Sequence, residues 1–450
     1  MARKYRLTTL GCKVNQYESQ QLREALDSIG FQPAAAGESA DLAVVNTCAV
    51  TAVAARKSRQ SIRRITDGGR VPAIVVGCYA TQAAEVLRRI PGVAAIIGHD
   101  SDIHGVLRDF ASRRLELRAD LHPSIPLPDG SVNGGTDGII HAFDGHQRAF
   151  LKVQDGCDAC CTYCIVPHLR PRLSSKPIPT AVEEAGGLVR AGHREIVVTG
   201  IYLGAYGRLT ALRHRQEGNG SPLADLVEAL AGVEGLVRLR LSSLEPGDLD
   251  DRLLAVLCRC ECCVPHLHLP LQSGSDAVLR RMNRQYNSGQ YVEMLRRVRD
   301  ALDRPAISTD IVVGFPGETD ADFEQTLAVA RQAGFCKIHA FPFSPRPGTA
   351  AARWTDQFVH AHVVRDRMRA LACVGRQSTE DFVRGFVGCM ERVIVEGPPD
   401  ADTQSLHSGR TDRYFEVQFE AADARPGDVV GVRIDGVGEA GAHGTRTIAD

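Results

Sequence analysis

Residues 155–164 read DGCDACCTYC and place four cysteines within ten residues. Two Cys-x-x-Cys pairs can be formed there, Cys157 with Cys160 and Cys161 with Cys164, and together they would supply the four ligands of a structural zinc site. The same stretch also contains a triplet with a 3-then-2 spacing, Cys157, Cys161 and Cys164, which leaves Cys160 unused. Thiolates select zinc, copper(I) or iron–sulfur clusters. The two interpretations therefore imply different metals.

The triplet is the more favourable interpretation, because Cys160 and Cys161 are adjacent and their side chains tend to diverge. One loop after the predicted strand at 149–156 lets the three cysteines of the triplet hold three irons of a [4Fe-4S] cube, with the fourth iron open. An open iron can bind the amino and carboxylate groups of S-adenosylmethionine, and electron transfer into the sulfonium then yields a deoxyadenosyl radical. The spacing is thus compatible with such a cluster, and the four-cysteine zinc site stays the alternative.

A second set of cysteines, Cys12, Cys48 and Cys78, is spread over the first 80 residues, and each member directly follows a predicted strand. Loops after the strands of an open parallel sheet gather along one edge, so the three thiols are expected to meet. Three ordinary core cysteines are the alternative, since free cysteine is often buried. If the site exists, His99 could complete a zinc centre, whereas three cysteines alone suit a cube with one open iron.

Composition limits the context in which these cysteines act. The amino terminus has neither an apolar h-region nor a small-residue cleavage site, so a cytoplasmic protein is expected, in which clustered cysteines are metal ligands or redox groups rather than disulfides. No apolar stretch of about 18 residues predicts a membrane span. The formal net charge of -1 gives no global electrostatic signal for nucleic acid.

The 450 residues predict an α/β protein of three domains. Residues 1–122 alternate strand-like and helix-like runs, which is typical of a parallel sheet. Residues 123–142, rich in Gly, Pro and Asp, are predicted to be a linker. Six βα units in residues 143–378 predict a partial TIM-like barrel, and the short strand-like runs of residues 379–450 predict a small β-barrel.

The chain strongly resembles the methylthiotransferases of the radical S-adenosylmethionine superfamily. The resemblance covers nearly the whole chain and is carried, besides the triplet, by LGCKVNQYES, VNTCAVT, VVGCYA, EIVVTGIYLGAYG, LSSLEPGD, HLHLPLQSGSD, TDIVVGFPGET and FPFSPRPGT. It implies a radical-generating [4Fe-4S] cluster on Cys157, Cys161 and Cys164. A second [4Fe-4S] cluster would be held by Cys12, Cys48 and Cys78. The central domain would be a (β/α)6 radical SAM barrel, and the last domain a TRAM-like RNA-binding barrel.

GCKVNQYES resembles the branch that acts on threonylcarbamoyladenosine in tRNA. The resemblance implies insertion of sulfur at carbon 2 of this base beside the anticodon, followed by methylation, with S-adenosylmethionine as radical source and as methyl donor. The implied partners are the tRNA anticodon stem-loop, an electron donor and a sulfur donor. The alternatives are methylthiolation of isopentenyladenosine tRNA or of a ribosomal protein, or a non-catalytic zinc RNA-binding protein.

Four residues past predicted barrel strands are candidates for contacts to S-adenosylmethionine: Gly200, Ser243, Glu245 and Gln272. The resemblance suggests that Gly200 contacts the methionine part, while Ser243 and Glu245 would bond the ribose hydroxyls or the methionine amine. The alternative for each is an ordinary turn or capping role.

Several further sequence features each allow two interpretations. Two basic stretches, residues 55–64 and 207–216, are candidates for tRNA binding, although solvated surface is the simpler explanation. His266 and His268 alternate along a strand and are predicted to be core or cleft histidines. The run CRCECC at 258–263 could be a further metal site or a thiol-rich loop. Pro171 stands where the family often has the glycine of Arg-Gly-Arg.

Overall fold

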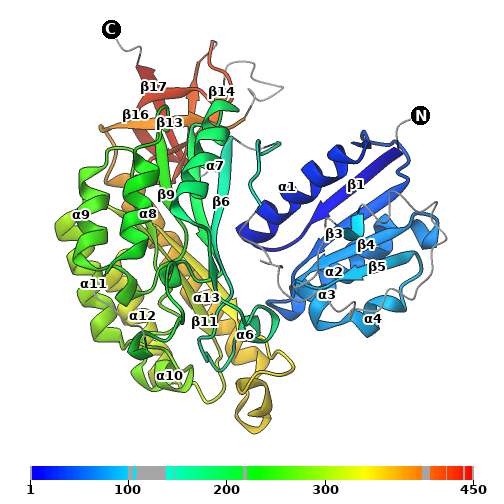
Figure 1. Ribbon diagram of the computed structural model, residues 1–450. Helices are drawn as coiled ribbons and strands as arrows, with labels where there is room; N and C mark the ends of the chain where they lie inside the picture. The colour runs from blue at the N-terminus through cyan, green and yellow to red at the C-terminus, as the bar shows by residue number, and fades with distance from the viewer. Residues whose placement is uncertain are drawn as a thin grey trace.

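The computed structural model describes residues 3–99, 105–107, 138–145, 147–215, 220–397, 406–421, 423–438 and 441–447 (Figure 1). Residues 123–137 of the predicted linker lie outside the described residues. Figure 1 shows an N-terminal sheet beside a larger central body, with a small barrel at the end of that body where the chain terminates.

The N-terminal sheet has five parallel strands in the order β2-β1-β3-β4-β5. The strands are β1 (Arg3–Thr9), β2 (Phe31–Pro33), β3 (Leu42–Thr47), β4 (Ala73–Gly77) and β5 (Val93–Ile97). The helices are α1 (Lys13–Ser28), α2 (Ala52–Ile65), α3 (Cys78–Gln82) and α4 (Ala84–Arg88). β3 and β4 are buried along their whole length, which explains why their sequences read as continuous apolar runs.

The central body is an open barrel made of two sheets, β7-β6-β8-β9 and β10-β11-β12, and the bridges Leu239–Cys263 and Ser243–His268 join them. Its strands are β6 (Arg148–Asp155), β7 (Ser174–Ser175), β8 (Glu195–Gly200), β9 (Arg238–Leu241), β10 (His266–His268), β11 (Ala306–Val313) and β12 (Lys337–Pro342). Its helices are α6 (Val166–Leu169), α7 (Ile178–Arg190), α8 (Pro222–Ala231), α9 (Asp251–Arg259), α10 (Asp276–Arg281), α11 (Ser288–Ala301), α12 (Asp320–Ala333) and α13 (Ala361–Arg384). Six parallel strands, all but β7, match the predicted βα units.

The C-terminal residues form a closed five-stranded barrel in the order β13-β14-β15-β17-β16. The strands are β13 (Met390–Val395), β14 (Leu406–Thr411), β15 (Glu416–Glu420), β16 (Val429–Gly438) and β17 (Gly441–Thr447). Buried arginines attach this barrel to β9: Arg238 pairs with Asp412 and donates to the Arg410 carbonyl at 2.9 Å, and Arg240 donates to the Asp412 carbonyl at 3.1 Å. Glu195 on β8 forms ion pairs with both arginines and so neutralises part of their charge.

Helix α1 connects the N-terminal sheet to the central body, and it lies beside β6 in Figure 1. Its Tyr17 hydroxyl donates to Glu184 on α7 at 2.7 Å, and Lys176 pairs with the same carboxylate. On the other side, Ile165 and Leu169 of the central body belong to the hydrophobic core beneath β3 and β4. No described helix has the length and apolar character needed to cross a bilayer.

Candidate active site

Cys12, Cys48 and Cys78 lie at the carboxyl ends of β1, β3 and β4, on the same edge of the N-terminal sheet. The pKa of the Cys48 thiol is raised to about 11, chiefly by burial and also by the charges of Cys78 and Cys12. The Cys12 residue is exposed, but its thiol is desolvated by its surroundings, and this together with the charge of Cys78 raises its pKa. The three thiols are thus close enough to interact electrostatically, as their positions after three parallel strands predict.

Tight backbone packing holds these thiols at the sheet edge. Gly77, just before Cys78, has φ +90°, and a Cβ there would lie 2.6 Å from the Thr47 carbonyl oxygen, so only glycine fits. Asn15 of α1 donates to the carbonyls of Leu10 and Thr47 at 2.8 and 3.0 Å. These contacts fix the loop that carries Cys12 against the end of β3.

Cys157, Cys161 and Cys164 lie in the loop after β6, and this loop is fastened on both sides. Gly156 has φ +78°, and a Cβ there would overlap the Arg172 carbonyl. The Thr162 amide donates to the Met282 carbonyl at 3.1 Å, and the Asn283 amide group donates to the Cys160 carbonyl at 2.9 Å.

The triplet cysteines are partly buried, whereas Cys160 is exposed. Burial raises the pKa of Cys157 and of Cys164 to about 12, and their mutual charges contribute. The Cys160 thiol instead donates to the Asp158 carbonyl at 3.6 Å. Cys160 is therefore exposed and bonded to the backbone, although its charge still acts on the neighbouring Cys161.

The two triplets face each other across the junction between sheet and barrel. Ile165, directly after Cys164, shares a hydrophobic cluster with Cys78. The pKa of Cys164 is raised mainly by burial and by the charge of Cys161, and the charge of Cys78 makes a smaller contribution. The two triplets therefore lie near each other at this junction.

The spacing of the sulfur atoms tests the zinc interpretation. Four thiolates on one tetrahedral zinc lie about 3.8 Å from each other, given Zn–S bonds of about 2.3 Å. Among the residues that the structure describes, only Glu18, His99 and Asp155 form a group whose three ligand atoms all lie within 4.8 Å of one another. Neither cysteine set does so. Wider spacing suits a cube, in which each thiolate binds a different iron.

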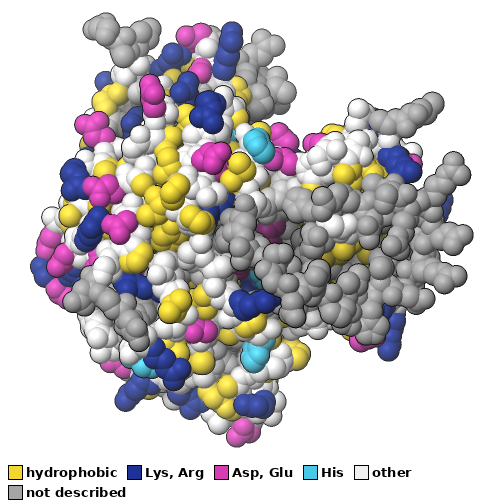
Figure 2. Space-filling model, viewed as in Figure 1, with side chains coloured by type: hydrophobic (Ala, Val, Ile, Leu, Met, Phe, Trp, Pro, Cys, Tyr) yellow, Lys and Arg dark blue, Asp and Glu magenta, His cyan; other side chains and the backbone are white. Residues whose placement is uncertain are grey.

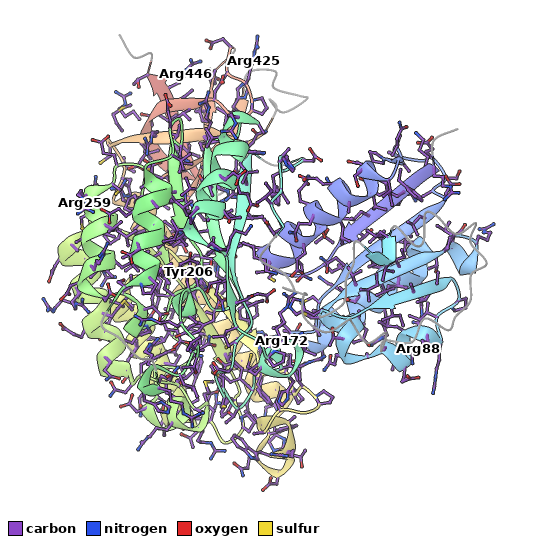
Figure 3. All side chains as sticks on the ribbon, in the orientation of Figure 1. Arg88, Arg172, Tyr206, Arg259, Arg425 and Arg446 are labelled. Carbon is purple, nitrogen blue, oxygen red and sulfur yellow. The ribbon has the colours of Figure 1, made fainter. Side chains whose placement is uncertain are left out.

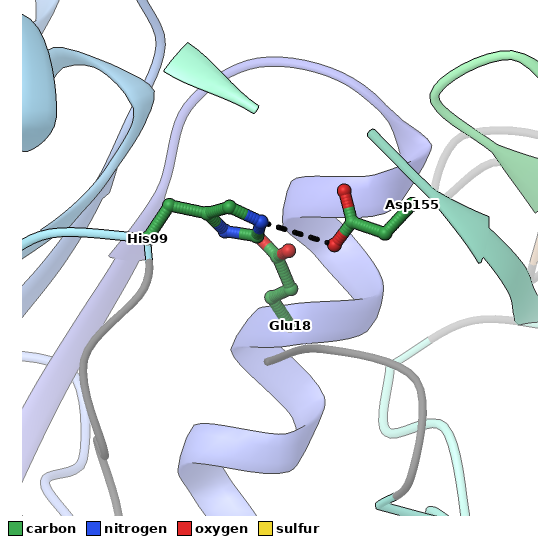
Figure 4. Close-up of side chains that lie close together, drawn as sticks. All are labelled: Glu18, His99 and Asp155. Carbon is green, nitrogen blue, oxygen red and sulfur yellow. Dashed lines mark ion pairs between the residues drawn. The ribbon is translucent and has the colours of Figure 1, made fainter. Parts of the chain in front are cut away.

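Glu18, His99 and Asp155 are part of a buried ionic network between the sheet and the barrel (Figure 4). Arg170 binds Glu18 through both terminal nitrogens, at 2.8 and 2.9 Å, and contacts both Asp155 oxygens at 3.0 Å. Lys152 bridges the same two carboxylates. Burial alone would raise the pKa of Glu18, but Arg170 and Lys152 lower it to about 2. Two cations already neutralise this group, so a metal ion is disfavoured there.

The network corrects the suggestion that His99 completes a zinc centre. The His99 ring nitrogen Nε2 lies 3.2 Å from Asp155 Oδ2, and it faces this carboxylate in Figure 4. The same network explains the role of the arginine before Pro171, because Arg170 is 1% exposed and joins α1 to the barrel. Arg172, by contrast, is exposed, and Figure 3 labels it where the two bodies approach each other.

Replacing Arg170 by Met is expected to destabilise the protein by about 3–5 kcal/mol at pH 7.5, because two buried carboxylates lose their main partner. The depressed carboxylate pKa stabilises the wild type above about pH 4.5, and this contribution is lost as the pH falls toward 2. In the variant the carboxylate pKa values rise, so the penalty should shrink between pH 7.5 and pH 5.

Urea unfolding of both proteins at pH 7.5 and pH 5 measures this effect. The control is Arg172→Met, an exposed position two residues away, for which a change within about 0.5 kcal/mol is expected. An Arg170→Met penalty that is the same at both pH values would show that the carboxylates do not control it.

Comparisons with known proteins agree with this arrangement. Residues 4–98 match the family model described as "Uncharacterized protein family UPF0004", and residues 151–330 match "Radical SAM superfamily". "Threonylcarbamoyladenosine tRNA methylthiotransferase MtaB" of Bacillus subtilis (strain 168) is 35% identical over 428 residues, covering 95% of this chain and 92% of the relative. The chain belongs to the radical SAM methylthiotransferase family. It is therefore an enzyme that uses a [4Fe-4S] cluster and S-adenosylmethionine.

Another relative of this methylthiotransferase chain is named for a different substrate. "tRNA-2-methylthio-N(6)-dimethylallyladenosine synthase" of Sphingopyxis alaskensis is 34% identical over 439 residues, covering 96% of this chain and 95% of the relative. Among solved structures, the radical S-adenosylmethionine methyltransferase TsrM from Kitasatospora setae, with cobalamin and a [4Fe-4S] cluster bound, gives a TM-score of 0.52 at 14% identity. The match covers 78% of this chain and 77% of that chain. This likeness supports the fold.

Arg284 is a residue of the methylthiotransferase site that the sequence did not indicate. It donates to the Cys161 thiol at 3.3 Å and to the Tyr163 hydroxyl at 3.4 Å, and it pairs with Glu245. Arg213 binds the other Glu245 oxygen at 3.0 Å. Glu245 is thus held by two arginines directly beside the triplet loop.

The other three candidates for S-adenosylmethionine contacts lie at the same end of the barrel as the triplet loop. Gly200 ends β8 and packs against Gln154, where a Cβ would lie 2.9 Å from the Gln154 Cβ. Ser243 is exposed and lines a cavity in the barrel. Gln272 has φ +63°, an uncommon conformation for a residue other than glycine that often marks a functional site.

The structure changes the interpretation of two further sequence features. Arg213, part of the basic stretch 207–216, pairs with Glu245 and Asp248 instead of facing solvent, so it is not free for tRNA. In the run 258–263, the Cys258 thiol donates to the Ala301 carbonyl and the Cys262 thiol to the Ala231 carbonyl. Cys263 contacts Cys262 and Cys260, so three of the thiols lie together, while Cys258 is bonded elsewhere.

His266 and His268 line the barrel cavity as cleft histidines. The His268 Nδ1 atom lies 3.0 Å from the Ser308 hydroxyl, and its Nε2 atom lies 3.3 Å from Asp310. His266 packs against Tyr414 of the C-terminal barrel, with 4.9 Å between ring centroids.

The motif FPFSPRPGT also contributes to the site by contacting the N-terminal sheet. Ser344 accepts a hydrogen bond from the Ala52 amide at 3.0 Å, at the start of α2. Arg346 is buried and donates to Gln82 at the end of α3. Arg346 lies within electrostatic reach of Cys48, so this motif lies beside the first cysteine set.

Proposed function

We propose that this enzyme converts threonylcarbamoyladenosine beside the tRNA anticodon to its 2-methylthio derivative. Cys157, Cys161 and Cys164 would hold the radical-generating [4Fe-4S] cluster, and Cys12, Cys48 and Cys78 a second one. The bound groups would supply a deoxyadenosyl radical, a sulfur atom and, from a second S-adenosylmethionine, a methyl group. The observation that carries this proposal is the proximity of the two sets: Ile165, next to Cys164, belongs to the same hydrophobic cluster as Cys78, and the charge of Cys78 acts on Cys164.

The protein residues would bind, orient and shield the reactants. Arg284 places a permanent positive charge 3.3 Å from the Cys161 sulfur, which favours the thiolate needed as a ligand. Gly200, Ser243, Glu245 and Gln272 are proposed to position S-adenosylmethionine at the strand ends. The buried Arg170 network would keep sheet and barrel together, so that water is excluded between the two cysteine sets.

The threonylcarbamoyl branch is favoured by the chemistry of the barrel cavity. The relatives of both branches are similar in identity, at 35% and 34%, so identity does not choose between them. The cavity is lined by seven Lys and Arg side chains and three Asp and Glu side chains. A threonylcarbamoyl group carries a carboxylate, which suits such a lining better than an uncharged isopentenyl group does. Isopentenyladenosine tRNA remains the second candidate because of the Sphingopyxis relative.

The test is a reaction with two anticodon stem-loops that differ in this base alone. Holoenzyme, reductant and S-adenosylmethionine are incubated with a threonylcarbamoyladenosine RNA or an isopentenyladenosine RNA, and the digested nucleosides are analysed by mass spectrometry. We expect the methylthio product from the first RNA. Product from the second RNA alone would mean that the reaction is correct and the substrate wrong.

The tRNA is proposed to contact helix α2 and the C-terminal barrel. On α2, Arg56, Lys57, Arg63 and Arg64 are exposed. By contrast, the helices on the left of Figure 2 carry interspersed charges of both signs. We also propose a cytoplasmic reaction that uses a separate electron donor and sulfur donor.

Replacing Arg63 and Arg64 by Ala should weaken tRNA binding and lower its salt dependence. Each lost phosphate contact reduces the slope of log K against log salt by about 0.7–0.9. The control is the double Ala variant of Arg296 and Arg297 on α11, where both arginines pair with carboxylates. Affinity measured at several salt concentrations decides the question: unchanged binding and slope would exclude this part of α2 from the interface.

A further inference from the structure

The inside of the barrel contains a cavity of about 1000 Å³ that reaches from the catalytic end of the strands to the C-terminal barrel. Ser243, a candidate contact for S-adenosylmethionine, lines it at one end. Tyr414 of the C-terminal barrel lines it at the other, and Lys13 of α1 contributes from the N-terminal sheet. Lys13 directly follows Cys12, so the cavity lining begins one residue from the first cysteine set.

Positive charge is concentrated around Tyr414. The guanidinium groups of Arg148, Arg240 and Arg410 lie 5.0, 4.8 and 4.9 Å from the centre of its ring. Each arginine also has a carboxylate behind it, since Arg148 and Arg410 pair with Glu396 and Arg240 pairs with Glu195. The positive charges of these three arginines are therefore partly neutralised by carboxylates that do not line the cavity.

Lys13 differs from these arginines. It is partly buried and lies within electrostatic reach of Tyr414, Arg240 and Arg148, yet it forms no ion pair or hydrogen bond with any residue in the described parts of the chain. Arg240, which is 3% exposed, also has a terminal nitrogen, Nη2, without a partner. A cation held among other cations, away from water and without a counterion, costs free energy that a bound anion would recover.

We propose that the Lys13 ammonium binds the carboxylate of the threonylcarbamoyl group and thereby selects this base over neutral N6 substituents. The inference rests on the proposed function. An adenine placed beside the first cysteine set can direct its N6 substituent into the cavity, because the cavity lining includes Lys13, the residue after Cys12. The arginines around Tyr414 add a positive potential that favours the same anion.

The test uses holoenzyme and three anticodon stem-loops with identical phosphates. One carries threonylcarbamoyladenosine, one its primary amide in place of the carboxylate, and one unmodified adenosine. For the wild type, we expect kcat/KM on the carboxylate RNA to exceed that on the amide RNA about 10- to 100-fold, the effect of one charge-assisted contact. Lys13→Gln should remove this difference, whereas Lys13→Arg should keep most of it.

Two controls separate this role from others. Lys4→Gln removes the same charge from the same sheet, at a partly exposed lysine that pairs with Glu38, and should leave the preference intact. Iron content and the visible spectrum of Lys13→Gln should match the wild type, because Lys13 is not a ligand. Binding of the unmodified RNA should also be unchanged, and equal weakening for all three RNAs would instead assign Lys13 to a phosphate and overturn the proposal.

The outcomes distinguish this inference from the proposed function. If the wild type makes the methylthio product equally well from the carboxylate and amide RNAs, the role of Lys13 is overturned and the proposed function stands. This comparison needs no variant, so it decides the question even if Lys13→Gln fails to fold. If the wild type makes no product from the threonylcarbamoyl RNA, both are overturned.

Discussion

Cys161→Ala should lower reductive cleavage of S-adenosylmethionine at least about 1000-fold, whereas the neighbouring Cys160→Ala should leave it close to wild type. A cube that loses one of three protein ligands is no longer held in the loop, and its radical chemistry is lost with it. Cys160 is exposed and bonded to a backbone carbonyl, so its loss should not affect the cluster. Deoxyadenosine released under reducing, anaerobic conditions measures the difference.

This pair of adjacent substitutions decides between the two interpretations of DGCDACCTYC. If both variants lose activity and metal to the same degree, all four cysteines act together and the triplet assignment is wrong. Reconstituted Cys160→Ala with the iron content and brown colour of the wild type would support the triplet.

Cys48→Ala should separate the two halves of the reaction. We expect it to retain cleavage of S-adenosylmethionine, because the triplet after β6 is intact, but to lose the methylthio product by about 100-fold or more. Iron should fall from about eight to about four atoms per chain, one cube fewer. Iron analysis, deoxyadenosine release and product analysis on one preparation test these three expectations together.

The control for Cys48→Ala is Cys263→Ala, which also removes a buried thiol but lies before β10, at the amino ends of the barrel strands rather than at the carboxyl ends that carry the triplet. It should keep its iron and its product yield. A Cys48→Ala enzyme that still makes methylthio product at the wild-type rate would exclude the second cluster, whatever its iron content.

The sequence predicted the positions of the two cysteine sets because both depend on local patterns. Apolar runs such as β3 and β4 mark buried parallel strands, and the residue after each strand must lie at the same edge of the sheet. The six barrel strands were predicted for the same reason. Strands β14 and β17 were not, because LHSGRT and GAHGTRT are polar and glycine-rich. Gly409 is needed in β14 because a Cβ at this position would lie only 2.5 Å from the Ile394 carbonyl oxygen.

Side-chain partners were much harder to predict than strand ends. Arg284 contacts Cys161 from 123 positions away, and Arg170 pairs with Glu18 from 152 positions away. Nothing near Arg213 in the sequence indicates that it faces two carboxylates instead of solvent. Long-range ion pairs depend on how the barrel and sheet meet, and the periodicity of single segments does not contain this information.

The most direct test of the account is the tRNA of a bacterium that lacks its own methylthiotransferases and expresses this chain. Digested tRNA is analysed by nucleoside mass spectrometry for the wild type and for Cys160→Ala, Cys161→Ala and Cys48→Ala. We predict methylthio-threonylcarbamoyladenosine with the wild type and Cys160→Ala, and none with the other two. Methylthio-isopentenyladenosine instead, or product that persists without Cys161 or Cys48, would contradict it.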